Sequence, residues 1–370
     1  MNRRLQNALV RAQERRHALA ADEIAALLAL TDPDDLAALH RAAYAVKVRH
    51  IGKQVSLRGI IEMGNVCAKN CFYCGIRRDN RVLERYQLDE PEILEAVQRN
   101  IALQYGSIVL QSGEIESEAH TLFIEQLLRK ITAMTDGTLG ITLSLGEQTA
   151  DTFRRWRSAG AHRYLLRIET SNPRLYARFH PADHSLERRR ECLRHLRTYD
   201  YQVGSGVMSG LPGQTCGDLA DDILFFHEMD VDMIGMGPYI PHHDTPLGRD
   251  IPFTKEYAAS HLNIGLNVIA ATRLYLHNVN IAATTALHAL ADDGREQGVL
   301  AGANVIMPNV SDVAYRRRYQ LYENKPAFDE SAEESRDELA RRLQGIGETI
   351  NWNKRGDSPR YAARKLVSGE

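Results

Sequence analysis

Three cysteines lie close together in the segment NVCAKNCFYCGIRRDN, where their spacing is C-x3-C-x2-C. They are Cys67, Cys71 and Cys74. Three neighbouring thiolates can hold three corners of a cubane 4Fe–4S cluster. A cluster that only transfers electrons normally has four protein ligands, so three local ligands leave one iron open to a substrate or cofactor. We therefore expect one 4Fe–4S cluster at these residues.

The cysteines have two simpler interpretations, a zinc knuckle completed by a distant histidine and reduced thiols without metal. Zinc sites favour C-x2-C pairs with tetrahedral closure, and the sequence contains no second pair. Cys192 and Cys216 are interpreted as structural. His242, His243 and Asp244 could form a second metal site, but the segment PYIPHHDTP is more typical of a solvent-facing loop.

The overall charge excludes some classes of partner. The chain has 370 residues, 25% of them charged, and a formal net charge of −2. This balance gives no global field for nucleic acid or an acidic membrane. The N-terminus lacks the apolar stretch of a signal peptide, and no run of roughly 18 apolar residues occurs. Thiolates with an open iron need a reducing compartment, so we expect a cytoplasmic protein. We also expect it to be a monomer.

Eight short apolar runs alternate with amphipathic stretches along most of the chain. The runs are residues 56–63, 107–111, 140–145, 163–169, 201–208, 231–237, 280–285 and 304–308. Apolar runs followed by roughly 10–20 residues of helical pattern indicate βα units and a parallel sheet. Eight such units close a barrel. The expected fold class is therefore α/β, a (β/α)8 TIM barrel.

Helical segments flank the predicted barrel. The first 50 residues are helical in pattern, with Thr31 or Asp32 as an N-cap and Pro33 in the first turn of a helix. The expected organisation is an N-terminal helical layer (1–50), a barrel (51–325), and a short C-terminal helix with a loose tail (326–370).

Polar residues that end apolar runs are the candidate site residues, because the active site of a barrel lies at the carboxyl ends of its strands. The first run ends just before the cysteine loop. The second ends in Gln111, Ser112 and Gly113, where a glycine permits close approach of a ligand. In the third run Thr142 and Ser144 alternate with leucines, so we expect both to face the lumen.

Later runs add charged and soft side chains. Glu169 follows LLRI and needs a cationic partner; Arg167 or Arg189 would serve structurally. Arg167 is itself expensive within an apolar strand unless it meets an anion. Met233 offers a soft surface for an adenine ring, although a core methionine is more common. The hydroxyl groups that could reach the mouth are those of Thr284, Thr285 and Tyr319.

The order of the motifs resembles that of a known family. RGIIEMGNVCAKNCFYCGIRRDN, IVLQSGE, ITLSLGE, YLLRIETSNP, GLPGQT, VDMIGMGPYIPHHDTPLG, ATTAL and GANVIMPN together resemble the HydE-type maturases of FeFe-hydrogenases. That family belongs to the biotin-synthase-like branch of the radical S-adenosylmethionine (SAM) superfamily. The resemblance runs from about Arg58 to Lys325.

This resemblance implies a barrel with one SAM-binding 4Fe–4S cluster at its mouth. The implied SAM contacts are Gln111, Ser112, Thr142, Glu169, Arg189 and Met233. The implied substrate and catalytic residues are Arg58, Arg167, Thr284, Thr285, Met307 and Tyr319. Glu169 would then face the positive amino and sulfonium groups of SAM. A one-residue offset in PADHSLERRR leaves Arg188 as a rival to Arg189.

The implied function is reductive cleavage of SAM to a 5′-deoxyadenosyl radical during maturation of the FeFe-hydrogenase H-cluster. The implied substrate is a small iron–carbonyl–cyanide complex of cysteine. Arg58 and Arg167, at the ends of inner strands, suit such an anionic ligand. An external electron donor and other hydrogenase maturases are the implied partners.

The sequence departs from one family feature and leaves two alternatives. Many HydE-type sequences carry further cysteines after the eighth strand for an auxiliary cluster, whereas none follows Cys216 here, which favours a single cluster. Biotin synthesis would need cysteines on inner strands that are absent near Ser205. A methylornithine-synthase-like mutase remains the alternative enzyme. A non-catalytic iron–sulfur carrier is the alternative of another class, and it would not need Glu169.

Overall fold

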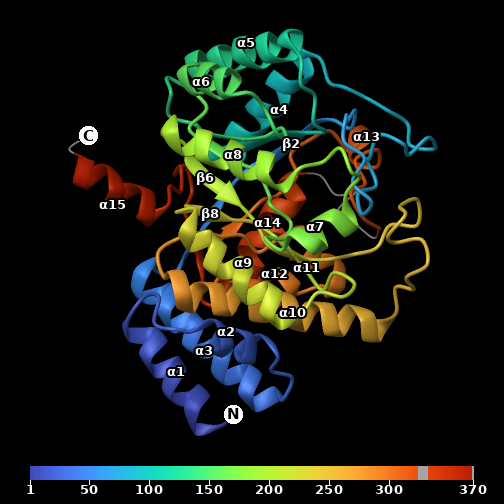
Figure 1. Cartoon of the computed structure of the whole chain (residues 1–370). Coiled ribbons are helices and arrows are strands. Elements are labelled where there is room, and N and C mark those ends of the chain that lie inside the picture. The colour runs from blue at the N-terminus through green and yellow to red at the C-terminus, as the bar shows by residue number, and fades with distance from the viewer. Residues whose placement is uncertain (324–331, 369–370) are drawn as a thin grey trace.

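The centre of the protein is a parallel sheet of seven strands in the order β10-β8-β6-β5-β4-β3-β2. The computed structural model describes residues 1–323 and 332–368 (Figure 1). The strands are β2 (Gly59–Gly64), β3 (Ser107–Ser112), β4 (Gly140–Ser144), β5 (Arg163–Leu165), β6 (Gln202–Ser205), β8 (Met233–Ile234) and β10 (Asn280–Ile281). Each strand lies within a predicted apolar run or overlaps it, so the prediction of a parallel α/β sheet is confirmed.

Two smaller sheets adjoin this sheet. One is parallel in the order β11-β1-β12, and single parallel bridges, Ile60↔Asn309 and Ala282↔Val305, link its β11 side to β2 and to the end of β10. The other pairs β7 with β9 just beyond the carboxyl ends of β6 and β8. Their strands are β1 (Gln54–Leu57), β11 (Val305–Ile306), β12 (Thr349–Ile350), β7 (Met208–Ser209) and β9 (Gly237–Pro238).

Helices follow the strands along the chain and cover one face of the sheet. They are α4 (Glu90–Ala102), α5 (Glu118–Met134), α6 (Ala150–Ser158), α7 (Pro173–Phe179), α8 (Leu186–Thr198), α9 (Cys216–Glu228), α10 (Lys255–Leu276), α11 (Thr285–Leu290), α12 (Gly294–Leu300) and α13 (Val313–Arg316). Among the described residues, no helix is long and apolar enough to cross a membrane.

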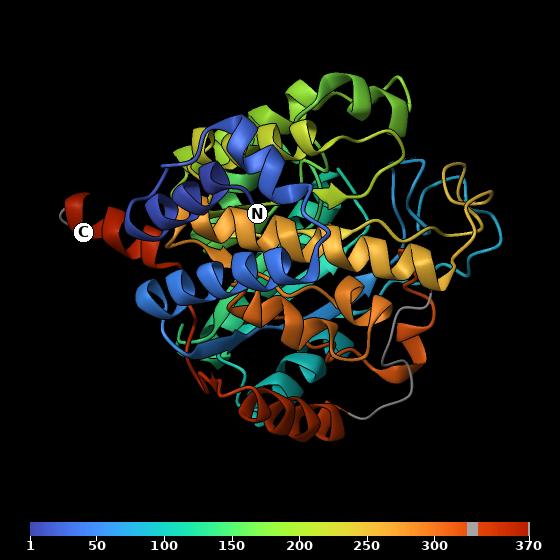
Figure 2. The same ribbon diagram turned by 90° about the horizontal axis from the view of Figure 1, so that it is seen from below.

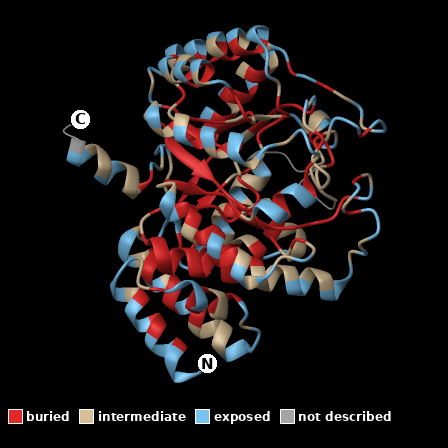
Figure 3. Cartoon of the chain, viewed as in Figure 1, coloured by how far each residue is buried: buried red, intermediate tan, exposed pale blue. Residues whose placement is uncertain are grey.

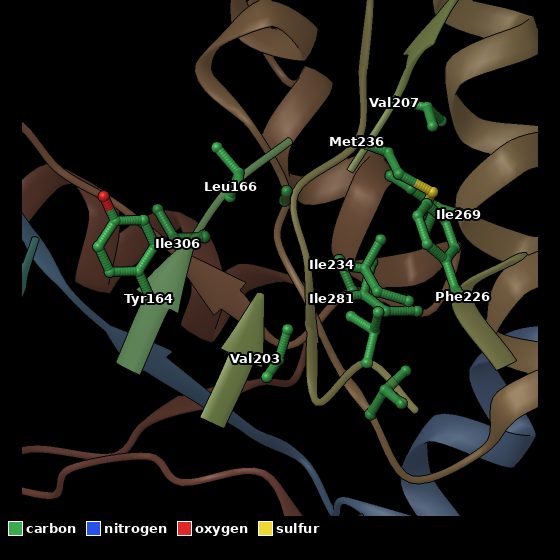
Figure 4. Packing of buried hydrophobic residues seen from close by; sticks show 14 of the residues in the cluster. Tyr164, Leu166, Val203, Val207, Phe226, Ile234, Met236, Ile269, Ile281 and Ile306 are labelled. Atoms are coloured by element: carbon green, nitrogen blue, oxygen red, sulfur yellow. The ribbon is translucent and has the colours of Figure 1, made fainter. Parts of the chain in front are cut away.

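The hydrophobic core lies between this helical layer and the sheet. Figure 4 shows part of it, where Ile234 and Ile281 from strands pack with Phe226 of α9 and Ile269 of α10. Burial is concentrated in the strands and the sheet-facing sides of the helices (Figure 3). Alternate strand residues such as Met233 are buried without joining this cluster, because successive side chains of a strand point to opposite faces. We call the face opposite the helices the inner face.

The predicted N-terminal helical layer is present. It comprises α1 (Arg3–Glu14), α2 (Ala21–Leu28) and α3 (Pro33–His50), which pack beneath α9 and α10 (Figure 1). Of the two candidate caps for α3, the structure uses Asp32, whose carboxylate accepts from the backbone N–H groups of Asp34 and Asp35, and Pro33 occupies the first turn. The helix is anchored by a buried ion pair between Lys47 and Glu348.

The C-terminal segment is more ordered than expected. It contains α14 (Ala332–Gly345), β12 and α15 (Pro359–Ser368). Residues 349–358, which we call the crossing segment, run across the amino ends of the central strands. Its Arg355 O accepts hydrogen bonds from Ser107 Oγ (2.7 Å) and Arg163 Nη1 (2.9 Å). Its Gly356 O accepts from Arg58 Nη2 (3.0 Å) and Asn280 Nδ2 (2.9 Å). The expectation of a loose tail is therefore wrong for this part, because buried donors at the strand starts need these carbonyl groups. The expected domain boundary at 325/326 lies outside the described residues.

The two ends of the sheet differ in what covers them. In Figures 1 and 2, α15 lies on the left, whereas the light-blue loop of residues 65–88 and the yellow loop of residues 239–254 lie on the right. The right-hand end is where β2 and its neighbours finish. It is the carboxyl end, at which chemistry is expected in sheets of parallel strands.

Candidate active site

The cysteines lie on a long loop, residues 65–88, that leaves the carboxyl end of β2. Cys67, Cys71 and Cys74 are half-buried. The loop after β3 is pressed against them, since Ala68 N–H donates to Glu114 O at 2.8 Å. A Cβ on Gly113 would lie 2.2 Å from Val66 O. Only glycine therefore fits at this contact. The glycine was expected to admit a ligand, whereas the structure shows that it admits the backbone of the cysteine loop.

Burial makes it costly for the three thiols to ionise without a positive charge beside them. Burial raises the pKa of Cys67, raises that of Cys71 to about 12, and raises that of Cys74 well above its usual value. The backbone N–H of Glu114 donates to Cys67 Sγ at 3.3 Å. Iron that replaces the three protons would neutralise the negative charge of the buried thiolates. The donor set therefore fits a site-differentiated 4Fe–4S cluster.

A network of charges holds the cysteine loop to the ends of β3 and β4. Lys69, between the first two cysteines, lies 3.3 Å from Glu114 Oε1 and 2.9 Å from Glu147 Oε2. Burial favours the neutral amine, but these carboxylates outweigh it and raise the pKa of Lys69. Glu147 also accepts from Arg189 Nε at 2.9 Å. The loop is thus fixed by ion pairs as well as by packing.

Arg188 and Arg189, the two candidates for one SAM contact, differ in burial and partners. Arg189 is buried, donates to Arg167 O at 2.9 Å, and acts electrostatically on Cys71. Arg188 is more exposed and pairs with Glu116, although its Nε also lies 3.3 Å from Glu147 Oε2. Arg189 is the more deeply buried of the two and the one that acts on Cys71.

Glu169 has an unusual backbone for a buried carboxylate. Its φ of 64° lies in the left-handed region, which costs a residue with a Cβ roughly 1–2 kcal/mol. Arg167 Nη2 lies 3.0 Å from its Oε2, the pairing anticipated as the structural alternative. That oxygen nevertheless accepts no hydrogen bond from the described residues. Glu169 also acts electrostatically on Cys71 and Cys74, so a strained carboxylate with spare capacity lies near the cysteines.

Gln111, Ser112 and Tyr319 meet at the same end. Gln111 Nε2 donates to Tyr319 OH at 3.2 Å, and Tyr319 is fully buried. Ser112 Oγ donates to Gly113 O at 2.7 Å. Burial raises the pKa of Tyr319, and the charges of Glu62 and Cys74 act in the same direction. The segment after the eighth run therefore does fold over the carboxyl end, as its position predicted.

Three predicted site residues lie deeper on the inner face. Thr142 is mid-strand in β4 and its Oγ1 is buried without a partner among the described residues. Met233 begins β8, and its Sδ accepts from Arg58 Nη1. Arg58 immediately precedes β2, so it lies at the amino end of the sheet. This differs from the expectation that it shares a ligand site with Arg167, because its guanidinium is held by Gly356 of the crossing segment.

Thr284, Thr285 and Met307 come from the segments after β10 and β11. The buried Oγ1 of Thr284 has no partner among the described residues, and a Cβ on Gly237 would lie 2.9 Å from it. Thr285 Oγ1 is 3.5 Å from Arg295 Nη2. Met307 is half-buried. Thr284 therefore has spare hydrogen-bonding capacity close to β9.

His242, His243 and Asp244 can bring their ligand atoms within 4.8 Å of one another. However, His243 is already paired with Glu323 and with Asp244. The Nδ1 atom of His242 accepts from Asp244 N–H at 3.1 Å. These contacts occupy the ligand atoms without a metal. The prediction of a solvent-facing loop is wrong for most of the segment, because His242 is only 3% exposed and residues 238–241 are buried, whereas His243 is exposed.

Two residues of the site escaped the sequence analysis, Lys69 and Glu147. A usable signal for Glu147 was present, because similar residues stand at or just after the ends of β3 and β4, SGE (112–114) and LGE (145–147). Lys69 carried no such signal, since a lysine between two cysteines is ordinary for an exposed loop.

Comparison with known proteins defines the class of enzyme. A family model described as the Radical SAM superfamily matches residues 61–226. Two solved structures have the same fold. Methylornithine synthase (PylB) matches with a TM-score of 0.78 and 21% sequence identity, covering 98% of this chain and 99% of that one. The FeFe-hydrogenase maturase HydG from Carboxydothermus hydrogenoformans matches with a TM-score of 0.77 and 19% sequence identity, covering 95% of this chain and 81% of that one. The protein is a radical SAM enzyme, a class that uses a 4Fe–4S cluster and SAM.

The particular family follows from a closer relative. The [FeFe] hydrogenase maturase subunit HydE of Thermotoga maritima is 43% identical over 300 residues, which cover 80% of this chain and 82% of that protein. The chain belongs to the HydE family. The resemblance stated from the motifs is confirmed.

Proposed function

We propose that this enzyme reductively cleaves SAM during assembly of the FeFe-hydrogenase H-cluster. The observation that carries the proposal is the 43% identity to a HydE maturase subunit, combined with three cysteines at the carboxyl end of the sheet. A cluster and SAM bound there would supply a one-electron cleavage of the sulfonium and a 5′-deoxyadenosyl radical. The chain's own task is to bind, orient and shield these groups.

We assign the cluster to Cys67, Cys71 and Cys74, and SAM to residues that extend from the carboxyl end of the sheet along its inner face. The assigned SAM contacts are Gln111, Ser112, Thr142, Glu169, Arg189 and Met233. Glu169 supports this assignment best, because its Oε2 has unused acceptor capacity and SAM carries positive groups. Arg189 would face the carboxylate of SAM, as a guanidinium suits that geometry.

The inner face is proposed to be the lumen of a complete (β/α)8 barrel. The bridges Ile60↔Asn309 and Ala282↔Val305 support closure, and the crossing segment would seal the amino end. A closed lumen excludes water and stray hydrogen donors. We retain residues 51–325 as the catalytic domain and residues 1–50 as its helical layer.

The substrate is proposed to be a small anionic, cysteine-derived iron–carbonyl–cyanide complex. Arg167, Thr284, Thr285, Met307 and Tyr319 would contact it. The unpartnered hydroxyl of Thr284 supports this assignment. Arg58 is given a structural role instead, because the crossing segment already accepts from its guanidinium.

We further propose that the enzyme works as a monomer in a reducing, cytoplasmic setting. It would receive electrons from an external donor and pass its product to other hydrogenase maturases. The half-buried, non-disulfide cysteines are compatible with such a compartment.

SAM cleavage is tested with the reconstituted protein, SAM and a chemical reductant. Parent protein should form 5′-deoxyadenosine, and Glu169→Gln should reduce this by about 10-fold or more, since charge-assisted hydrogen bonds are roughly twice as strong as neutral ones. Glu125→Gln on α5, a carboxylate that pairs with Arg129 and Arg155 instead of the cysteine loop, is the matched control. Parental turnover by Glu169→Gln would show that this carboxylate does not bind SAM.

The pathway is tested separately by maturation of an apo-hydrogenase with the other maturases present. Active hydrogenase should form with the parent protein and not with Cys71→Ala. A protein that cleaves SAM but never supports maturation would favour the mutase alternative. A protein that supports maturation without cleaving SAM would favour the carrier.

A further inference from the structure

One guanidinium organises the loop that carries all three cysteines. Arg85 donates to five main-chain carbonyl groups, those of Asn65 (2.6 Å), Ile76 (2.8 Å), Arg77 (2.6 Å), Arg78 (3.3 Å) and Asn80 (3.1 Å). The first acceptor precedes Cys67 and the others follow Cys74. Arg85 therefore ties together the two sides of the cysteine loop.

Arg85 is itself held in place by the residue it binds. Asn65 Nδ2 donates to Glu84 O at 2.9 Å, and Asn65 Oδ1 accepts from Tyr86 N–H at 2.9 Å. The side-chain amide of the buried Asn65 therefore binds the backbone of both neighbours of Arg85, Glu84 and Tyr86. Asn80, another of the acceptors, donates its Nδ2 to Gly75 O at 2.7 Å. The guanidinium is part of a rigid set of contacts rather than a mobile surface group.

The charge of Arg85 has no carboxylate partner among the residues that the structure describes. Burial lowers the pKa of Arg85, and the neighbouring charges of Cys67 and Cys74 oppose that change. Most arginines of this protein that bind carbonyl groups near the surface also pair with an acid, as Arg157 does with Asp200. The guanidinium of Arg85 instead lies close to the cysteines, because its acceptors Asn65 O and Ile76 O are each two residues from Cys67 or Cys74.

We propose that Arg85 is a positioning residue for the cluster: it sets the spacing of the three cysteines before iron binds and places a fixed positive charge beside two of them. The planar fork of a guanidinium can bind several carbonyl groups at once, whereas a lysine ammonium cannot span them. This inference rests on the proposed function only in requiring a cluster at these cysteines.

The test compares Arg85→Lys, which keeps the charge, with Arg85→Gln, which removes it. Both variants lose the fork, so both reconstituted proteins should release iron to a chelator about 10-fold faster than the parent, the low end of what outer ligand partners contribute to metal affinity. In the cluster-loaded fraction, the midpoint potential of Arg85→Gln should be more negative than that of Arg85→Lys, because loss of a positive charge favours the oxidised cluster. Arg157→Gln is the matched control.

Circular dichroism and thermal unfolding of each protein separate this role from a general structural one. Native melting behaviour with fast iron release supports the proposal. Parental iron release and potential in both variants would overturn it, as would a global loss of folding in Arg85→Lys. Failure of the proposed function is distinguishable, because the parent would then bind iron normally and form no 5′-deoxyadenosine.

Discussion

Glu169 joins two features that rarely occur together, a left-handed backbone and a buried carboxylate. Within residues 1–323 and 332–368, six of the other seven non-glycine residues with positive φ are His, Asp or Asn, the types for which this region is less costly. Selection for folding alone would place glycine here. The backbone strain at Glu169 therefore supports the proposal that its carboxylate binds SAM.

We expect Glu169→Gly to be more stable than Glu169→Ala by about 1 kcal/mol, because only glycine adopts a φ of 64° without strain. Both variants should lose SAM cleavage to a similar extent, since both lack the carboxylate. Urea unfolding of the two proteins measures the difference. Equal stabilities would mean that the backbone at residue 169 relaxes out of the left-handed region.

At the scale of elements, the sequence located the central strands but not the segments that join them. A short apolar run and the helical pattern after it marked each central strand. By contrast, β12 is only Thr349–Ile350, half-exposed and in polar surroundings, so no apolar run announces it. The contacts of Arg85 and Lys69 were equally hidden, because main-chain carbonyls and loop carboxylates leave no periodic signal.

The helix α3 and the segment that enters β12 are linked by a buried ion pair. Lys47 and Glu348 have fully buried side chains, and Tyr44 OH donates to Glu348 Oε1 at 2.6 Å. Lys47→Met leaves the carboxylate without its counter-charge. We expect this change to lower the free energy of unfolding by about 3–5 kcal/mol.

The double variant Lys47→Met, Glu348→Gln should be less destabilised than Lys47→Met alone, since no isolated charge remains and the amide oxygen still accepts from Tyr44. Arg4→Met, which breaks an exposed pair with Asp22, is the control and should cost at most about 1 kcal/mol. Chemical unfolding followed by circular dichroism measures all three. A double variant as unstable as the single one would contradict the argument.

For the whole molecule, the arrangement predicts one cluster per chain. Cys192 is buried on α8 with Sγ 3.5 Å from Gln148 O, and Cys216 begins α9. Neither lies on the cysteine loop. A reconstituted Cys192→Ala, Cys216→Ala double variant should therefore retain about four irons per chain. Iron and sulfide analysis checks this, and roughly eight irons in the parent would contradict it.

The position of β1 has a consequence for how the chain reaches its native state. This strand pairs on one side with β11 and on the other with β12, both of which follow every strand of the seven-stranded sheet. Until β11 and β12 have folded, both edges of β1 are unpaired, and contacts between segments so far apart in the sequence form slowly. An unpaired strand edge can form hydrogen bonds with another molecule and lead to aggregation. The strand is only four residues long, with Lys53 before it and Arg58 after it, and short strands flanked by charge are the form in which an unpaired edge aggregates least.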